Sequence, residues 1–295
     1  MAIVERKTAG ERSLHAVNIF LLILLTVIFL YPMWHCLMAS FSDPVSLIGY
    51  KGFIFTPMGF SLKGYETVFK NQSILIGYTN TLIYVVGGTA LSMALTVLGG
   101  YCLSRRNMMF KRFITLAIVI TMYVDFGLIP AFLNIRDLRL YDTRWAIVLP
   151  VAINTYNLII MRTAFAALPP SLEESAMIDG ANDFIVLFRI QLPLIKATFA
   201  VVLLFYAVGM WNSWYSAVIY LLDRRMFPLQ LFLREILIAN ANSTMAEANS
   251  VDGVQFLDEL IKYCSIIVST LPILIVYPFV QKYFVTGVMI GSIKE

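Results

Sequence analysis

Nine polar or aromatic side chains stand inside long apolar stretches of the sequence, where lipid or other protein segments would surround them. They are Asp125, Asn154, Tyr156, Asn157, Tyr206, Trp211, Asn212, Trp214 and Tyr215. Amide and carboxylate groups hydrogen-bond hydroxyl groups, and aromatic faces pack against C–H groups. Side chains of these types lining a path between helices could hold a polar solute. An acid at membrane depth, such as Asp125, is a functional candidate in its own right.

Each of these residues also has a structural alternative. Asn154 and Asn157 lie three residues apart on one helical face and could instead hydrogen-bond to a neighbouring helix. The aromatic residues of the 211–215 stretch could form an interfacial belt near the outer end of their helix. Asp125 could reach outer water from the outer half of its helix. The sequence leaves both interpretations open for these positions.

Nothing in the sequence indicates a catalytic or metal centre. His15 and His35 have no plausible metal-ligand partners, and no cluster of acids, histidines or nucleophile–base pairs stands at membrane depth. The three cysteines, Cys36, Cys102 and Cys264, lie in apolar runs and suggest no disulfide framework. The Gly-x-x-x-x-Gly-Lys-Ser/Thr phosphate loop is also missing from the sequence. We therefore expect a protein that is not an enzyme.

A second group of residues, in the polar 171–193 segment, has the chemistry of a short capped helix. Pro169 and Pro170 stop the preceding helix. Ser171 and Glu174 have the Ser-x-x-Glu spacing of a capping box, and Glu173 adds negative charge where the helix dipole favours it. The pattern predicts that a helix begins at Ser171.

The same segment predicts where this helix ends. Gly180 falls where a left-handed cap is needed, and Ala176, four residues earlier, leaves the same face without bulk. Asn182 or Asp183 can cap a second helix that runs to Leu192-Pro193. We expect a helix-turn-helix that presents a docking knob on the cytoplasmic membrane surface. An ordinary amphipathic connector is the alternative.

The elements that must position these residues are membrane helices. The chain is 59% hydrophobic and only 14% charged, whereas a soluble domain carries about 25% charge. Its surface must therefore mostly face lipid, and we expect an all-α integral membrane protein with no separate soluble domain. Six apolar stretches predict transmembrane helices near 14–38, 76–103, 113–133, 144–166, 195–220 and 262–284.

The basic residues predict the orientation of these helices. The short loop between the second and third contains Arg105, Arg106, Lys111 and Arg112 and no acid. Short basic loops stay on the cytoplasmic side. We therefore expect a multi-pass protein of the bacterial cytoplasmic membrane with both termini in the cytoplasm. The long segments 39–75 and 221–261 would lie outside, the second as a lid of short helices. The net charge is only +4, and no basic block in the sequence suggests binding to nucleic acid.

The 171–193 segment also resembles the cytoplasmic EAA loop of ABC importer permeases. The similarity lies in Glu174-Ser175-Ala176, in Gly180 six residues after that glutamate, and in Ile190-Gln191-Leu192-Pro193. Ser175 stands where the family usually has alanine. The surrounding residues are similar to the carbohydrate branch, the relatives of the maltose permease subunit MalG. The stretches at 142–145, 211–214, 228–235 and 281–287 look most like the LplC-type permeases for complex or acidic oligosaccharides.

The resemblance implies a type I importer permease fold in which this segment is the coupling helix. Its ATPase-coupling residues would be Ser171, Glu173, Glu174, Ala176, Asp179, Gly180 and Ala181. It further implies an N-terminal part, 1–71, with one helix and an outer loop, and a permease core, 72–292, with five helices. The partners would be a second homologous permease, two ATPase subunits that bind ATP and Mg²⁺, and an extracellular binding protein.

The substrate that the resemblance implies is an oligosaccharide, acidic or derived from a polysaccharide. The nine residues at membrane depth would then contact sugar. A permease for a small sugar or a phosphorylated polyol is the alternative within the family. A secondary transporter is the alternative outside it, although such proteins usually show inverted repeats and coupling-ion residues at the midplane.

Overall fold

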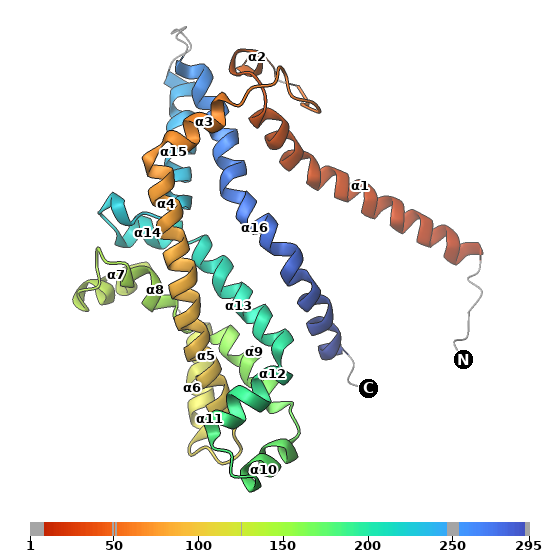
Figure 1. The fold of residues 1–295 in the computed structure, drawn as a ribbon, viewed down its shortest axis with the longest axis vertical. Helices are drawn as coiled ribbons and strands as arrows, with labels where there is room; N and C mark the ends of the chain where they lie inside the picture. Colours follow the sequence, from red (N-terminus) through yellow and green to blue (C-terminus); the bar gives the residue numbers. More distant parts are fainter. Residues whose placement is uncertain (1–8, 49, 51, 125, 247–253, 293–295) are drawn as a thin grey trace. The chain divides into compact units, whose positions relative to one another are not determined.

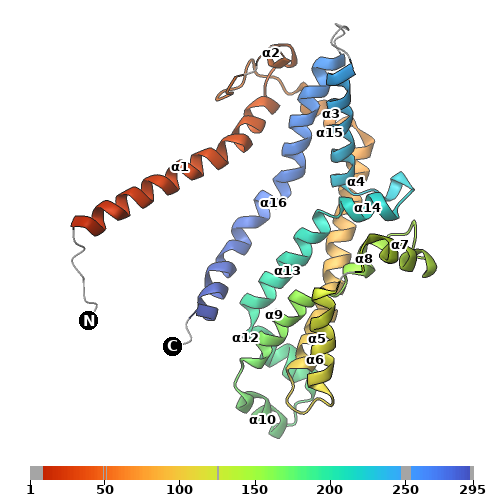
Figure 2. The ribbon, with the colours of Figure 1, turned by 180° about the vertical axis from the view of Figure 1, so that it is seen from behind.

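The computed structural model describes residues 9–48, 50, 52–124, 126–246 and 254–292. Over these ranges the chain forms helices and turns, with one isolated bridge between Ser42 and Phe60. The chain divides into two compact units, shown in sequence colours in Figures 1 and 2. Unit 1 comprises 1–71 and 236–270, and unit 2 comprises 72–235 and 271–295.

Unit 1 is built from an apolar helix, two short helices and parts of two later ones. It contains α1 (Ala9–Ser40), α2 (Pro44–Ile48) and α3 (Lys63–Lys70), with the end of α15 (Leu229–Ala246) and the start of α16 (Val254–Ser292). Gly64 of α3 packs directly on α16, since a Cβ added there would lie 2.6 Å from the Cys264 Sγ. The Cys264 thiol donates to the Ser40 carbonyl over 3.4 Å, which ties the end of α1 to α16.

Unit 2 begins with a continuous rod of α4 (Gln72–Ile83), a π-helical turn η1 (Tyr84–Gly88) and α5 (Thr89–Ser104). Three helices follow the rod: α6 (Lys111–Tyr123), α7 (Leu128–Asp137) and α8 (Trp145–Val148), the last continued by the 3-10 turn η2 (Leu149–Val151). The next are α9 (Thr155–Ala166), α10 (Pro170–Ile178), α11 (Asp183–Ile185) with the π-helical turn η3 (Val186–Gln191), and α12 (Leu192–Leu194). The last before α15 are α13 (Lys196–Trp211), α14 (Trp214–Tyr220) and the 3-10 turn η4 (Arg224–Met226). The rod packs on α9 and α13.

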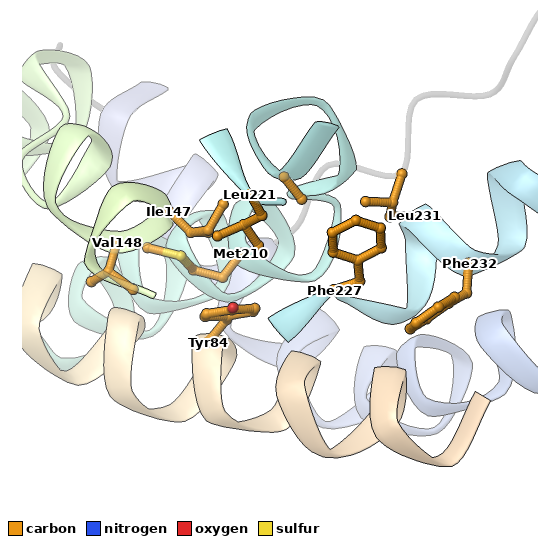
Figure 3. Packing of buried hydrophobic residues seen from close by; sticks show 9 residues of the cluster. Tyr84, Ile147, Val148, Met210, Leu221, Phe227, Leu231 and Phe232 are labelled. Carbon is orange, nitrogen blue, oxygen red and sulfur yellow. The ribbon is translucent and has the colours of Figure 1, made fainter. Parts of the chain in front are cut away.

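Two large apolar clusters hold unit 2 together, with a smaller one of Ile135, Ala146 and Tyr220. One large cluster lies between α5, α9 and α13 and includes Met93, Met161 and Val202. The other large cluster joins η1, α8, α13 and the start of α15, and Figure 3 shows its side chains directed toward one another. Tyr84 is a member, and its hydroxyl donates to the Met226 carbonyl over 2.7 Å. The clusters bury only part of the apolar side chains of the unit. Many large ones stay exposed, as contact with lipid requires.

Three helices of the described chain are long and apolar enough to cross a membrane unbroken. They are Ser13–Ser40, Gln72–Ser104 and Glu259–Pro278. Three bent helix pairs pass the same test: α6 with α7, Trp145–Val151 with α9, and Asp183–Leu194 with α13. If each pair is one span, the described chain has six spans. The predicted all-α membrane class is therefore confirmed.

Several predicted helix boundaries are wrong. The helix predicted at 113–133 is divided into α6 and α7, with Gly127 at a φ of +81° before α7. The helix at 144–166 bends by 48° between Val151 and Thr155. The helix at 195–220 is interrupted at Asn212 and Ser213, between α13 and α14. The 221–261 segment contains the 18-residue helix α15 rather than short helices only.

Candidate functional site

The predicted helix-turn-helix is present as α10 and α11, but its first helix begins differently. The helix starts at Pro170, with Pro169 as the N-cap and no capping side chain. Proline is favoured in the first turn because its φ already suits a helix and its missing N–H needs no partner. Ser171 is therefore inside the helix, and the predicted Ser171–Glu174 capping box does not form. Glu173 does lie in the first turn, where the helix dipole favours a carboxylate.

The end of α10 follows the prediction closely. Gly180 has a φ of +83°, a conformation that side chains with a Cβ rarely adopt. The Ala181 N–H donates to the Ala176 carbonyl over 2.9 Å, and the Gly180 N–H donates to the Met177 carbonyl over 3.0 Å. These two bonds define a Schellman motif. Asn182 then caps α11, since its side-chain oxygen accepts from the Ile185 N–H over 2.9 Å.

Arg105, at the end of α5, holds the two helices of this element together. Its guanidinium pairs with Glu173 of α10 and with Asp183 of α11, and it lies 5.0 Å from the centre of the Tyr101 ring. The Tyr101 hydroxyl also donates to Asp183 over 3.3 Å. Figure 1 shows α10, α11 and the turn between α5 and α6 at the same end of unit 2. The sequence interpretation used Arg105 only to predict orientation and missed this role.

We expected Ala176 to leave room for a partner protein. This expectation is wrong, because Ala176 is buried within this chain. The helix α10 packs on η3 instead, and the Gln191 amide nitrogen donates to Glu173 over 3.5 Å. The outward side of the element presents other groups. Ser171, Glu174 and Asp179 are exposed, and Ile178 is 86% exposed. An apolar side chain so exposed beside acids is a suitable contact for another protein.

A second site is a cavity of 250 Å³ in unit 2, formed by residues of η2, α8, α9, α13 and α14. Five of the nine predicted solute-contacting residues line it: Asn154, Asn157, Tyr206, Asn212 and Tyr215. Ser213, Ser216 and Phe205 also line the cavity and were missed by sequence interpretation. None of its lining residues carries a charge. The cavity therefore combines amides, hydroxyls and aromatic faces, the groups that bind hydroxylated solutes.

The Tyr206 hydroxyl organises this cavity. It accepts from the Asn154 N–H over 3.0 Å and shares a hydrogen bond of 2.7 Å with the Thr96 hydroxyl. The Asn154 side-chain oxygen accepts from the Asn157 N–H over 3.1 Å, so Asn154 is the N-cap of α9. The Asn154 side chain thus caps its own helix rather than bonding to a neighbouring one, and the bond to α13 is made by its backbone N–H. The Asn212 amide donates to the Val208 carbonyl over 3.0 Å.

The remaining predicted residues lie outside the cavity lining. Trp211 is buried, with its ring edge-on to Tyr78 at 6.4 Å. Its burial within the protein argues against an interfacial belt position for this residue. Trp214 lies under the Arg234 guanidinium at 4.6 Å. The Tyr156 ring is exposed, near Phe205. Asp125 is outside the described residues, so its prediction stays untested.

Comparison with known proteins identifies the family. Residues 96–233 match the family described as binding-protein-dependent transport system inner membrane component. The polygalacturonan/rhamnogalacturonan transport system permease protein YtcP of Bacillus subtilis (strain 168) is 39% identical over 92% of this chain and 95% of its own length. Protein LplC of the same organism is 37% identical over 97% of both chains.

A solved structure supports the same assignment. A chain from the crystal structure of a bacterial ABC transporter involved in the import of the acidic polysaccharide alginate matches with a TM-score of 0.85 and 31% identity. The match covers 94% of this chain and 99% of that one. The resemblance first indicated by the 171–193 segment is confirmed. This chain belongs to the binding-protein-dependent transport system inner membrane components, and it is a permease subunit of an ABC importer.

Proposed function

We propose that this chain forms half of the translocation path for an oligosaccharide, acidic ones included, across the cytoplasmic membrane. Relatives support this substrate class, because one is named for polygalacturonan and rhamnogalacturonan transport and a structural neighbour for alginate. All three polymers contain acidic sugars. The second permease half, two ATPases and an extracellular binding protein complete the assembly. Both termini of this chain lie in the cytoplasm.

The cavity beside Tyr206 is the observation that carries the proposal for the substrate path. Its amides can hydrogen-bond sugar hydroxyls, and the rings of Phe205 and Tyr215 offer faces for sugar C–H groups. The lining has no carboxylate, so the uronate groups of an acidic sugar meet no like charge. A volume of 250 Å³ is small for an oligosaccharide. This agrees with a path that two permease subunits build together, each contributing one wall.

The element formed by α10 and α11 is the proposed contact with an ATPase. That partner binds ATP and Mg²⁺, and this chain responds to the movement that ATP hydrolysis causes in the partner. Ile178, Glu174 and Asp179 form the exposed face that the ATPase contacts. Arg105 then transmits displacement of this element to α5, because its side chain pairs with both helices of the element.

Uptake of a labelled oligogalacturonide tests the proposal. The importer is reconstituted with its second permease, ATPases and binding protein, and Asn157→Ala is compared with wild type. We expect a lower uptake rate at unchanged membrane insertion, because a buried amide of the cavity is lost. The matched control is Asn134→Ala, which removes an exposed amide of α7 outside the cavity.

Three results would contradict the proposal in different ways. Preference of the wild-type importer for amino acids or inorganic ions would refute the sugar assignment. Wild-type uptake by Asn157→Ala would leave the substrate class intact and remove this cavity from the path. Robust uptake by the single chain in liposomes driven by an ion gradient would instead indicate a secondary transporter.

A further inference from the structure

A second, basic cavity lies between the first turns of α6 and the last part of α9. Neither the substrate path nor the element formed by α10 and α11, which we call the coupling element, uses it. Its volume is 610 Å³, and its lining residues are Lys111, Arg112, Thr115, Leu116, Val119 and Arg162. Three of these six side chains are cationic. A cavity of this size lies within the range that holds small molecules, about 300–1,000 Å³.

The cations of this cavity have no acidic partners in the part of the chain that the structure describes. The carboxylates that form ion pairs there are Glu173, Asp183, Asp137, Glu235 and Asp223, and none of these pairs includes a cavity residue. The Lys111 ammonium donates to the carbonyls of Ser104 and Arg105 over 3.0 and 2.8 Å, which leaves one of its three N–H groups. Like charges brought together without a counter-charge are unfavourable, so an anion would relieve the repulsion.

Two buried polar atoms also lack partners at this cavity. The Thr115 hydroxyl and the Arg162 Nε are both shielded from solvent and make no hydrogen bond among the described residues. A buried donor without a partner costs about 1–3 kcal/mol. Both residues line the cavity, so an oxyanion within it could accept from both. These two unused donors, together with the free cations, indicate a ligand with acceptor oxygens and negative charge.

The apolar part of the cavity indicates what is attached to that anion. Lys111, Thr115 and Val119 are spaced four residues apart and share one face of α6, which changes from basic to apolar along the helix. No residue of α6 is buried, and Leu116 and Ile120 are large exposed apolar side chains. A free phosphate would leave this apolar stripe uncovered. A lipid with an anionic headgroup would fill the basic end and lay its acyl chains along the rest.

We infer that the cavity of Lys111, Arg112, Thr115 and Arg162 binds the phosphate headgroup of an anionic phospholipid. In the proposed orientation this end of α6 and α9 faces the cytoplasm, so the lipid belongs to the inner leaflet. Basic pockets between membrane helices on that side are suited to acidic headgroups. The site adjoins the coupling element, because the Lys111 ammonium bonds to the Arg105 carbonyl. The bound lipid thereby stabilises the loop that holds Arg105.

Lipid retention by the assembled importer tests this inference. The complex is purified in neutral detergent, incubated with equal amounts of phosphatidylglycerol and phosphatidylcholine, and analysed by native mass spectrometry. We expect the wild type to retain phosphatidylglycerol preferentially. Arg162→Gln should weaken that preference about fivefold, the effect of one basic residue near anionic lipid. Arg162→Lys should keep most of it, and Thr115→Val should lose part of it without a change in charge.

Arg136→Gln is the matched control, because Arg136 is exposed, pairs with Asp137 and lies outside the cavity. Equal retention by wild type, Arg162→Gln and Arg136→Gln would overturn the inference. If an equal concentration of inorganic phosphate displaces phosphatidylglycerol, the cavity binds a free anion, and the inference that a lipid supplies the phosphate is wrong. Loss of the ATPases from Arg162→Gln at unchanged lipid preference would identify a protein occupant and overturn it too. The lipid readout does not require transport, so failure of the sugar proposal would leave it unaffected.

Discussion

Replacement of Arg105 by glutamine should uncouple ATP hydrolysis from the membrane helices while leaving the fold intact. The Arg105 side chain is 20% exposed, and its partners Glu173 and Asp183 are 29% and 62% exposed. The pair with Asp183 is close to a surface ion pair and contributes about 0.5 kcal/mol. The better shielded pair with Glu173 contributes about 1.5 kcal/mol, as a hydrogen bond between charged groups does.

The sum, about 2 kcal/mol, decides what the substitution can do. It corresponds to about a thirtyfold change in the equilibrium between the docked and undocked positions of α10. It is much too small to remove helices from a membrane, where every unsatisfied backbone group costs several kcal/mol. Arg105→Gln should therefore insert normally and assemble. Its ATPase activity should respond poorly to the loaded binding protein, and uptake should fall by about tenfold or more.

The assay is binding-protein-stimulated ATP hydrolysis in the reconstituted complex, measured together with uptake and with co-purification of the ATPase. Arg136→Gln serves as the control, since it breaks an exposed pair with its own neighbour Asp137. A double-mutant cycle of Arg105→Gln with Glu173→Gln should show a coupling energy of about 1.5 kcal/mol, the contribution of that pair. If Arg105→Gln keeps stimulation and uptake within twofold of wild type, Arg105 does not transmit the motion of α10, and the reasoning is wrong.

Three further experiments test other parts of the structure. Gly180→Val places a β-branched residue at a φ of +83°, so it should reduce stimulated ATP hydrolysis at normal insertion, and Gly180→Asn should be milder. Asn182→Ala should speed hydrogen exchange in α11 by the loss of a cap worth about 1 kcal/mol, whereas Ser171→Ala should leave exchange in α10 unchanged because Ser171 caps nothing. Lys111→Cys, in a background free of native cysteines, should not be labelled by an impermeant reagent on intact cells. Labelling from outside would reverse the proposed orientation.

The sequence predicts which stretches are helical but not where those helices break. An apolar run reports only that lipid or protein surrounds it, and this remains true on both sides of a bend. The interruption at Asn212 and Ser213 is only two polar residues long, so it does not end the apolar run. Asn154 did give a signal, since asparagine is a favoured N-cap. Residues 144–166 nevertheless have the length and composition of one membrane span, so the sequence predicts a single helix there.

Competition between two local signals explains the error at α10. Ser171 and Glu174 have capping-box spacing, but Pro170 is equally suited to the first helical turn, and the structure follows the proline. Gly180 had no competitor, since a left-handed residue after a helix favours glycine strongly, and there the prediction is confirmed. Arg105 could not be found in this way. Its partners are 68 or more residues away in sequence, and the pairing of such charges is decided by the packing of α5.

The connection between the two sites follows from the order of the helices. α9 carries Asn154 and Asn157 and leads directly into α10, while α11 and α12 lead directly into α13, which carries Tyr206. α5 carries Thr96 and ends at the residue before Arg105. The Tyr206 hydroxyl bonds to both Thr96 and the Asn154 N–H, so three helices meet at one oxygen atom. Each of the same three helices has one end next to the coupling element: the C-terminal ends of α5 and α9 and the N-terminal end of α13. A displacement of α10 that moves α5 relative to α9 would therefore strain the hydrogen bonds of Tyr206, which links the proposed ATPase contact to the cavity wall through α5, α9 and α13.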